Sequence, residues 1–455
     1  MKNELKKEVP MSEIFPRSIR VRELSGMTAM EREELLARPT ADMTPFMEGV
    51  KPIIEEVKQR GDAALVAYAE KFDGAALTVQ TLECSEAEFD AAEKTLDPEV
   101  KAAIRYAAEN IRHFHETQLP EPLKMVEIRP GVAGGEKTTP IPSVACYVPR
   151  GKGSFPSVAL MTVVPAVVAG VETVIVLTPP GPDGSVDAGT LYAVRVAGAS
   201  RVFKCGGAQG IAAAAYGTET VPKVAKVVGP GSPWVVAAKR LLADFIDPGL
   251  PAGPSESIVL ADETADPKLA ALDLIVESEH GPDSSAFLVT PSRTVAEAAR
   301  ESIPGFLENL SETRRDYVTT VLTGSHGGIL LAGSMDAAIA FVNDFAPEHL
   351  EILSDDPHQY LDRIRNAGEI LLGRHTPFTL GNYLIGPNAV LPTGGWAKTF
   401  SPLSVHDFLK RTSIAHVSES AYPELAEKAH TLAIYEGFDG HAQAVSKTRD
   451  VLLKE

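Results

Sequence analysis

The fold is decided by the stretch Pro140-Ile141-Pro142-Ser143-Val144-Ala145-Cys146-Tyr147-Val148-Pro149, which separates two kinds of sequence. Before it, apolar residues recur mainly at helical spacing, as in residues 40–61 and 98–118. After it, short apolar runs alternate with Ala-rich stretches of helical character, and the first runs are residues 143–148, 173–177, 201–205 and 226–228. Most runs contain β-branched residues and are followed closely by Gly or Pro, which is typical of βαβ units and a parallel sheet.

A second series of apolar runs follows at residues 257–261, 286–290, 329–332 and 369–372. Two such series predict an α/β protein with two Rossmann-like lobes, each built on a parallel sheet. We expect the first lobe to be discontinuous, over residues 41–146 and 257–403, and the second to span residues 147–256. The polar residues 1–40 predict an N-terminal arm, and residues 404–455 predict a helical C-terminal appendage.

The composition limits the class of protein. The chain has 455 residues, more than one domain usually holds, and 44% of them are hydrophobic, as in ordinary globular proteins. Its formal net charge of −18 argues against nucleic-acid binding, because nothing offsets phosphate repulsion over most of the surface. Cys84, Cys146 and Cys205 form no CxxC pair, so we expect a reducing, cytoplasmic location. No stretch approaches the roughly 20 apolar residues of a membrane span, so none is expected.

The segment Val276-Glu277-Ser278-Glu279-His280-Gly281-Pro282-Asp283 has the pattern of a helix end. The apolar stripe that predicts the helix consists of Leu269, Leu272, Ile275 and Val276. Residues three apart lie above one another on a helix, so Glu277 and His280 point the same way. A carboxylate and an imidazole so placed are natural ligands for a divalent metal, although spacing alone also allows an exposed ion pair.

Two glycine-bearing turns follow strands of the first series, at residues 205–210 and 229–232. Glycines at a strand-to-helix turn let backbone amides approach a phosphate, although neither turn has the GxGxxG spacing and both could be simple packing turns. A third turn, residues 147–153, carries Arg150 and Lys152, which could meet a phosphate or an anionic substrate.

Two further segments carry polar side chains of catalytic type. Residues 251–256 offer Ser255 in a loop bounded by Pro and Gly, just before a strand. In residues 343–350, Glu348 stands directly beside His349, and both side chains are of the type that moves protons near neutral pH. The spacing equally allows a helix that begins with acidic residues in its first turn.

These segments together resemble the histidinol dehydrogenase family. The resemblance covers residues 40–455, in order and at compatible spacings, and rests on residues 147–149, 206–209, 229–231, 252–256, 279–283, 346–350, 390–393 and 436–441. It implies a zinc enzyme that uses two NAD+ in succession and oxidises an alcohol to an aldehyde and then to a carboxylate at one site. It also implies a domain-swapped homodimer with shared active sites, in which residues 404–455 serve dimerisation.

Residue by residue, the resemblance implies four zinc ligands, namely Glu277, His280, Asn382 and His441, the last being His441 of the partner subunit. It implies that His349 is the general base for the alcohol and that Glu348 activates the water that attacks the aldehyde. The positions that match NAD contacts are Tyr147, Gln209 and Ser232. The substrate contacts implied are Ser255, Glu436, His349 and the four zinc ligands.

The sequence departs from the family pattern at four positions. Glu277 stands where the family usually carries Gln, and Asn382 stands where it carries Asp. These exchanges oppose each other, so the ligand charge is unchanged and we expect the metal to be kept. Ala389 replaces a His near the substrate, and Ser232 replaces an Asn on the nucleotide side.

The departures bear on the substrate. Ala389 and the exchanged ligand pair favour a small polar alcohol other than histidinol. The candidate is then a paralogue that resembles sulfopropanediol dehydrogenase, a relative within the family that runs the same two-step oxidation on a small anionic diol. L-histidinol, giving L-histidine, is the alternative. A binding protein of the same fold without turnover is a further alternative, which predicts neither stoichiometric zinc nor NAD reduction.

Overall fold

A computed structural model describes residues 19–38, 42–151 and 153–453 of the chain. The chain divides into two compact units, of which unit 1 is Met1–Gln118 with Ile141–Phe408 and unit 2 is Leu119–Pro140 with Leu409–Glu455. Unit 1 contains two parallel sheets, so the predicted α/β class with parallel sheets is confirmed. Half of the predicted arm, residues 1–18 and 39–40, and the cation Lys152 lie outside the described residues.

One lobe of unit 1, which corresponds to the predicted second lobe, is built on a four-stranded parallel sheet in the order β6-β5-β4-β7. Its strands match the predicted runs and are β4 (Ser143–Tyr147), β5 (Thr173–Leu177), β6 (Arg201–Phe203) and β7 (Lys226–Val228). Because β5 and β6 lie on one side of β4 and β7 lies on the other, the strand order reverses between β4 and β7. Ligands of open parallel sheets bind at such a reversal, outside the carboxyl ends of the strands.

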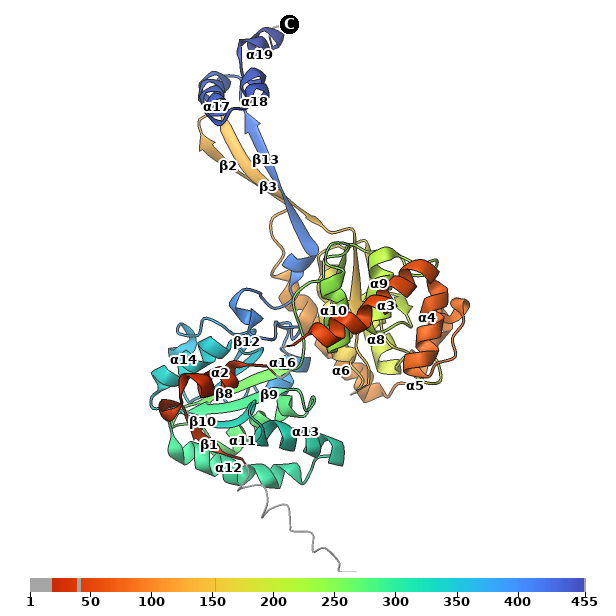
Figure 1. The fold of residues 1–455 in the computed structure, drawn as a ribbon, viewed down its shortest axis with the longest axis vertical. Helices are drawn as coiled ribbons and strands as arrows, with labels where there is room; N and C mark the ends of the chain where they lie inside the picture. The colour runs from red at the N-terminus through yellow and green to blue at the C-terminus, as the bar shows by residue number, and fades with distance from the viewer. Residues whose placement is uncertain (1–18, 39–41, 152, 454–455) are drawn as a thin grey trace, which may run out of the picture. The chain divides into compact units, whose positions relative to one another are not determined.

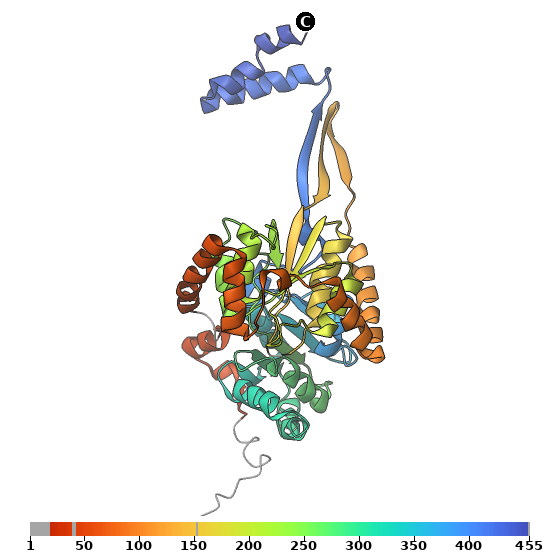
Figure 2. The ribbon, with the colours of Figure 1, turned by 90° about the vertical axis from the view of Figure 1, so that its right-hand side faces the viewer.

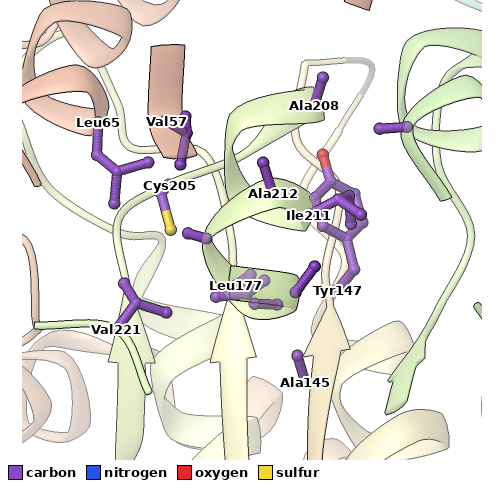
Figure 3. Packing of buried hydrophobic residues seen from close by; sticks show 14 of the residues in the cluster. Val57, Leu65, Ala145, Tyr147, Leu177, Cys205, Ala208, Ile211, Ala212 and Val221 are labelled. Carbon is purple, nitrogen blue, oxygen red and sulfur yellow. The ribbon is translucent and has the colours of Figure 1, made fainter. Parts of the chain in front are cut away.

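Two groups of helices cover this sheet (Figure 1). One group consists of α5 (Glu86–Thr95), α6 (Pro98–Glu116), α7 (Pro156–Val168) and α8 (Ala188–Ala197). The other consists of α3 (Thr44–Arg60), α4 (Asp62–Tyr68), α9 (Gly207–Tyr216) and α10 (Pro233–Leu241). Figure 3 shows Val57 of α3 and Leu65 of α4 in one cluster with Leu177 and Ala212, all of them buried.

The predicted lobe boundary at residue 146 is therefore wrong. Helices α3 and α4 share a hydrophobic core with residues 145–246, and α5 and α6 contact α7 and α8. Helix α6 also reaches the segment 257–403, through hydrogen bonds of Asn110 with Leu384 and of His115 with Asn388. The apolar stripe of α3, which includes Val50, Ile54 and Val57, rests against the Ala-rich helix α9, whose small side chains allow close approach. A stripe predicts that a helix buries one face, but it does not tell which of two sheets that face covers.

The other lobe of unit 1, which contains the second series of predicted strands, is built on a six-stranded parallel sheet in the order β1-β10-β9-β8-β11-β12. Its strands are β1 (Val21–Glu23), β8 (Glu256–Ala261), β9 (Ser285–Thr290), β10 (Gly327–Leu331), β11 (His349–Leu353) and β12 (Glu369–Leu372). The core on one face includes α11 (Pro267–Ser278), α12 (Arg293–Leu307) and α13 (Glu312–Thr323). The core on the other includes α2 (Ala29–Leu36) and α14 (Met335–Phe345). The short helices α15 (His358–Leu361) and α16 (Phe378–Tyr383) follow β11 and β12.

Two strands of this sheet are absent from the prediction. The three-residue strand β1 lies in the predicted arm and pairs with β10, so residues 19–38 belong to the lobe and the arm is wrong for this part. Strand β11 is a buried central strand that pairs with both β8 and β12. It begins with His349 directly after Glu348, and these polar residues interrupt the apolar pattern from which strands were predicted.

Unit 2 contains a three-stranded antiparallel sheet in the order β13-β3-β2, followed by helices (Figures 1 and 2). Its elements are β2 (Leu123–Arg129), β3 (Val132–Pro140), β13 (Leu409–Val417), α17 (Tyr422–Glu436), α18 (Asp439–Ala444) and α19 (Lys447–Leu452). The appendage predicted from residue 404 thus begins a few residues too early, since unit 2 resumes at Leu409. The prediction also lacks the hairpin of β2 and β3, which belongs to unit 2 because β13 pairs with β3 along its whole length. The short helical turns of the chain are Leu24–Gly26, Ala69–Asp73, Val79–Thr81, Trp396–Lys398 and Val405–Phe408.

In the described part of the chain, no helix is both long enough and apolar enough to cross a membrane. Cys84, Cys146 and Cys205 are buried and form no disulfide with one another.

Candidate active site

Glu277 and His280 lie at the carboxyl end of α11, as the sequence predicts. The buried face of α11 differs from the predicted stripe, because Leu272 is exposed while Asp273 and Glu277 are buried. Glu277 is only 1% exposed, and its Oε2 lies 3.2 Å from His280 Nδ1. Its Oε1 accepts a hydrogen bond of 2.7 Å from Asn382 Nδ2. Glu277 and Asn382, the two positions at which acid and amide are exchanged relative to the family pattern, are thus joined by a hydrogen bond.

A sharp turn of the backbone places Glu348 and His349 close to Glu277. Helix α14 ends at Ala346, which has φ of 53° and is the one non-glycine residue of the described chain with a positive φ. Such a conformation costs about 1 kcal/mol or more and is often found near functional sites. Pro347 then prevents the helix from continuing, so His349 opens strand β11 rather than lying on a helix.

The imidazole of His349 is surrounded by carboxylates. Its Nε2 lies 3.7 Å from Glu348 Oε2 and 4.0 Å from Glu277 Oε2. Its Nδ1 donates a hydrogen bond of 2.5 Å to Glu369 Oε1. Phe378, fully buried in α16, presents its ring edge-on to the imidazole, with 6.0 Å between ring centroids.

This arrangement perturbs the acid–base properties of the group. Burial raises the pKa of Glu348 to about 8, helped by the charge of Glu277 and opposed by His349. Burial alone would lower the pKa of His349, but the carboxylates of Glu277, Glu348 and Glu369 raise it to about 10. Burial opposes ionisation of Glu277, yet His280, His349 and the hydrogen bonds from Asn382 and Ser255 outweigh it, so the pKa of Glu277 is lowered.

The donor set has a partial fit to a divalent cation. His280 Nδ1 is buried and makes no hydrogen bond, although it lies 3.2 Å from Glu277 Oε2, so the two atoms could face a common cation. The Asn382 amide turns its nitrogen to Glu277, which leaves its oxygen as a possible ligand. Within the described residues, however, no three His, Cys, Asp or Glu side chains form a group that could hold a metal. A complete tetrahedral shell therefore needs a donor from elsewhere.

Glu256, Glu348 and Arg38 form a supporting network beside these residues. The Glu256 backbone N–H donates to Glu348 Oε2 at 3.0 Å. The Arg38 guanidinium donates to both carboxylate oxygens of Glu256 at 2.9 and 3.1 Å and stacks on the ring of Phe345. Ser255 precedes Glu256, and its hydroxyl helps to lower the pKa of Glu277; its predicted contact with the substrate stays a prediction.

The predicted nucleotide contacts lie at the carboxyl end of the four-stranded sheet. Tyr147 ends β4, and its hydroxyl accepts a hydrogen bond of 3.1 Å from the backbone N–H of Gly207 at the start of α9 (Figure 3). Burial raises the pKa of Tyr147 to about 12, so the hydroxyl keeps a hydrogen to donate. Gln209 is buried in the first turn of α9, and Ser232 precedes α10 without capping it.

Gly229 shapes the turn after β7. Its φ is +109°, and a Cβ there would lie 2.2 Å from the backbone oxygen of Tyr147. Only glycine therefore lets this turn approach the end of β4. Arg150, one of the two predicted cations, donates to the Pro180 carbonyl at 2.7 Å, so it is tied into the loop after β5.

Glu436 and His441 lie in unit 2. Glu436 is the last residue of α17, and His441 lies in α18 with its ring centroid 5.2 Å from that of Phe438. Both side chains are exposed. The sequence prediction that joins them to the other site residues stays a prediction.

The sequence prediction missed three side chains of this region, namely Glu369, Phe378 and Arg38. Glu369 is a charged residue at the start of a predicted apolar run, which is a weak signal. Its contact with His349 depends on the register of β11 and β12, where the two residues are directly paired. The two-residue spacing of His113 and His115 in one helix predicts two surface residues, but His115 is fully buried, with Nδ1 2.8 Å from the Ile111 carbonyl.

Comparison with known proteins tests the family resemblance of the sequence. The family model described as "Histidinol dehydrogenase" matches residues 36–449. A "Histidinol dehydrogenase homolog" of Cereibacter sphaeroides is 58% identical over 432 residues, 95% of this chain and 98% of that protein. One of Colwellia psychrerythraea is 56% identical over 436 residues, 96% of this chain and 98% of that protein. A "Histidinol dehydrogenase" of Synechocystis is 49% identical over 433 residues, 95% of this chain and all of that protein.

A solved structure shows the same fold. The crystal structure of histidinol dehydrogenase from Elizabethkingia anophelis has a TM-score of 0.89 and 32% identity, over 94% of this chain and 98% of that chain. With a family model over nearly the whole length and relatives of this similarity, the chain belongs to the histidinol dehydrogenase family, NAD-dependent oxidoreductases that act on a CH–OH group in a four-electron oxidation.

Proposed function

We propose that this chain is a zinc- and NAD-dependent dehydrogenase that oxidises a small polar alcohol, other than histidinol, through the aldehyde to the carboxylate. The observation that carries the proposal is that the buried side chains of Glu348 and Glu277 both lie within 4.0 Å of His349 Nε2. His280 and Asn382 contact Glu277 beside them. Burial of so many ionisable groups is costly for a fold, and perturbed groups of this kind are typical of catalytic sites.

In the first oxidation, His349 takes the proton of the alcohol at Nε2 while the carbon-bound hydrogen leaves as hydride to NAD+. The free Nε2 is the nitrogen that faces Glu348 and Glu277, because Nδ1 is occupied by Glu369. A divalent cation held by Glu277, His280 and Asn382 would polarise the substrate oxygen. It would also offset the Glu277 charge that raises the pKa of His349, and so free this imidazole to act as a base near neutral pH.

In the second oxidation, Glu348 accepts a proton from the water that attacks the aldehyde, and a second hydride leaves to NAD+. A carboxyl group with a pKa of about 8 changes its protonation state near neutral pH, which suits this role. The Glu256 backbone N–H holds one oxygen of Glu348 in place.

Zn2+ is the metal that best suits the proposed shell of one carboxylate, one amide and two imidazoles. The fourth ligand would be His441 of the partner subunit, which requires a homodimer. Unit 2 supports this, since its side chains of Tyr435, Leu432, Ile434 and Phe438 are exposed. Strand β2 also exposes apolar residues on both faces, and such surfaces are typical of contacts between chains.

NAD+ would lie at the carboxyl end of the four-stranded sheet, where Tyr147, Gln209 and Ser232 gather near the helix N-termini. Backbone N–H groups and the dipoles of α9 and α10 would face its phosphates. The Ser232 hydroxyl makes no capping bond, so it remains available as a donor or acceptor to the nucleotide.

The substrate preference follows from the departures of this chain. Ala389 cannot supply the hydrogen bonds of the imidazole usual at its position, and a substrate imidazole would lose that partner. The two relatives that are 56% and 58% identical carry the word "homolog" in their names, which agrees with a paralogue. L-histidinol remains the second candidate, because the Synechocystis relative named histidinol dehydrogenase is 49% identical along its whole length.

The test is NADH production by the zinc-loaded protein with L-histidinol and with 2,3-dihydroxypropanesulfonate, side by side. We expect two NADH per molecule of the sulfonate and slow or absent turnover of histidinol. Efficient turnover of histidinol alone would make the chain the biosynthetic enzyme. Absence of stoichiometric zinc and of NAD reduction with every alcohol tried would favour a binding protein without turnover.

The shared site has its own test. Chains with His441→Ala and chains with Glu348→Gln are each expected to lose the complete oxidation of the alcohol to the carboxylate, but a mixed dimer should regain it at one of its two sites. A proven heterodimer without activity would contradict the sharing of sites between subunits.

A further inference from the structure

Glu369 makes the closest polar contact of His349. Their Oε1 and Nδ1 atoms are 2.5 Å apart, and both side chains are almost fully buried. The two residues are direct partners in the parallel pairing of β11 with β12, and each is the first residue of its strand. A backbone bond from Glu369 N–H to the Glu348 carbonyl, 3.0 Å long, fixes this register. The contact is therefore built into the sheet.

The contact determines which imidazole nitrogen is free. A carboxylate can only accept, so Nδ1 of His349 must carry the hydrogen. In the neutral imidazole, Nε2 then holds the lone pair, and Nε2 is the atom that points to Glu348 and Glu277. Without a partner at Nδ1, the imidazole would be free to adopt the other tautomer, in which Nε2 carries a hydrogen and cannot take a proton.

Glu369 is also fitted to helix α16. A Cβ on Gly381 would lie 3.0 and 3.1 Å from the two oxygens of Glu369, so a glycine leaves the room that this carboxylate occupies. Its Oε2 is buried and has no hydrogen-bond partner among the described residues. Gly381 directly precedes Asn382, and Phe378 of the same helix packs edge-on against the imidazole. The carboxylate and the ring of Phe378 together hold the imidazole in one orientation.

We propose that Glu369 is a positioning residue for the general base: it holds the Nδ1–H tautomer of His349 and stabilises the imidazolium that forms when Nε2 takes the alcohol proton. The proposal rests on the proposed function, in which His349 is that base. In the step concerned, the O–H bond gives its proton to Nε2, the C–H bond gives a hydride to NAD+, and a C=O bond forms. Glu369 stays ionised and does not receive the proton.

The experiment compares Glu369→Ala and Glu369→Gln with wild type, all zinc-loaded and supplied with the alcohol that wild type oxidises. Loss of a group that orients a functional imidazole typically costs about 10- to 100-fold in activity. We expect a fall of this size in kcat for Glu369→Ala, with KM and zinc content nearly unchanged. Glu369→Gln keeps an acceptor for Nδ1–H without the charge, so it should recover part of the loss. Gly381→Ala should lower kcat in the same way although Glu369 is chemically intact.

A second readout does not depend on turnover. In protein labelled with ¹⁵N-histidine, the His349 signal is assigned by its loss in His349→Asn. We expect a downfield Nδ1–H resonance in wild type that disappears in Glu369→Ala, while thermal unfolding shows that the variant is folded. Glu83→Gln, which removes a carboxylate paired with Arg201 in the other lobe, is the matched control and should change neither readout.

An unchanged Nδ1–H resonance in folded Glu369→Ala, or an unchanged kcat, would overturn the proposal. If wild type oxidises no alcohol at all, the proposed function fails, and the resonance alone then decides whether Glu369 holds the tautomer.

Discussion

The two parallel sheets of unit 1 carry their polar groups at opposite ends of their strands. In the four-stranded sheet, Tyr147 and the turn at Gly229 follow the carboxyl ends of β4 and β7. In the six-stranded sheet, His349 and Glu369 are the first residues of β11 and β12, and Glu348 directly precedes β11. The same architecture therefore places one candidate site at the carboxyl edge and the other at the amino edge.

Helix direction explains why the two edges suit different ligands. Helices α9 and α10 begin at the carboxyl edge of the first sheet, and helix N-termini carry partial positive charge. Helices α11 and α14 end near the amino edge of the second sheet, and helix C-termini carry partial negative charge. The first edge suits the phosphates of a dinucleotide, and the second, with its carboxylates, suits a divalent cation.

The largest effect is expected from His280→Ala, which removes a proposed ligand at the amino edge. We expect loss of stoichiometric zinc and a fall in turnover of about 10³-fold or more, since a bound metal contributes several kcal/mol. If the two edges work separately, NAD+ affinity should stay within about twofold of wild type. Metal content by mass spectrometry, NADH production and NAD+ titration make the test. Retained zinc and full activity in His280→Ala would contradict a metal site at the amino edge.

The next largest effect is expected from Glu348→Gln. An amide cannot take a proton from water, so oxidation of the aldehyde should slow by about 100-fold or more. Oxidation of the alcohol, which uses His349, should slow less. The measurement is NADH production with the alcohol and with the aldehyde supplied separately. Equal losses in both halves would contradict separate roles for these adjacent residues.

Gly229→Ala tests the carboxyl edge alone. The new Cβ would lie 2.2 Å from the backbone oxygen of Tyr147, and the alanine would have to adopt a φ of +109°. We expect NAD+ binding to weaken about tenfold, near 1.4 kcal/mol, with zinc content unchanged. Gly305→Ala is the matched control, because its Cβ would meet nothing within 4 Å. Loss of zinc in Gly229→Ala would show that the two edges are coupled.

Local pattern was enough to predict the eight strands of the two apolar series and the helix end that carries Glu277 and His280. It could not assign residues 42–118 to the correct sheet, since a helical stripe does not identify its partner. It also missed β11, because this central strand begins with His349, directly after Glu348, and contains Glu351, so it lacks a long apolar run. The family resemblance supplied the candidate ligands, whereas the contact of Glu369 with His349 appears only once the strand register is known.

The same limit applies to a second buried pair, Asp273 and Glu351. Asp273 falls outside the predicted apolar stripe of α11, and Glu351 sits in the missed strand β11, so neither gives a signal in the sequence. In the structure both are buried, and the charge of Asp273 acts on Glu351. Burial and the like charge of its neighbour disfavour ionisation of both carboxylates together, so one of the two keeps a proton.

The smallest expected effect follows from this pair, and it concerns the interior of the six-stranded lobe rather than its edge. Burial, with the charge of Asp273, raises the pKa of Glu351 from 4.5 to about 9. The unfolded chain releases this proton above pH 4.5 whereas the folded chain retains it. The contribution of Glu351 to stability is therefore complete below its unfolded pKa and is lost as the pH rises towards its folded pKa.

Glu351→Gln replaces the titrating group with a neutral amide of similar size. Its free energy of unfolding should fall less between pH 5 and pH 8 than that of wild type, by about 1 kcal/mol. Denaturant unfolding at the two pH values measures the difference, and Glu83→Gln in the other lobe should behave like wild type. Since the substitution leaves the residues of the amino edge in place, zinc content and kcat at pH 7 should change little. A fall equal to that of wild type would mean that Glu351 is already ionised in the folded lobe, and that the negative charge gathered around His349 extends into the interior of the sheet.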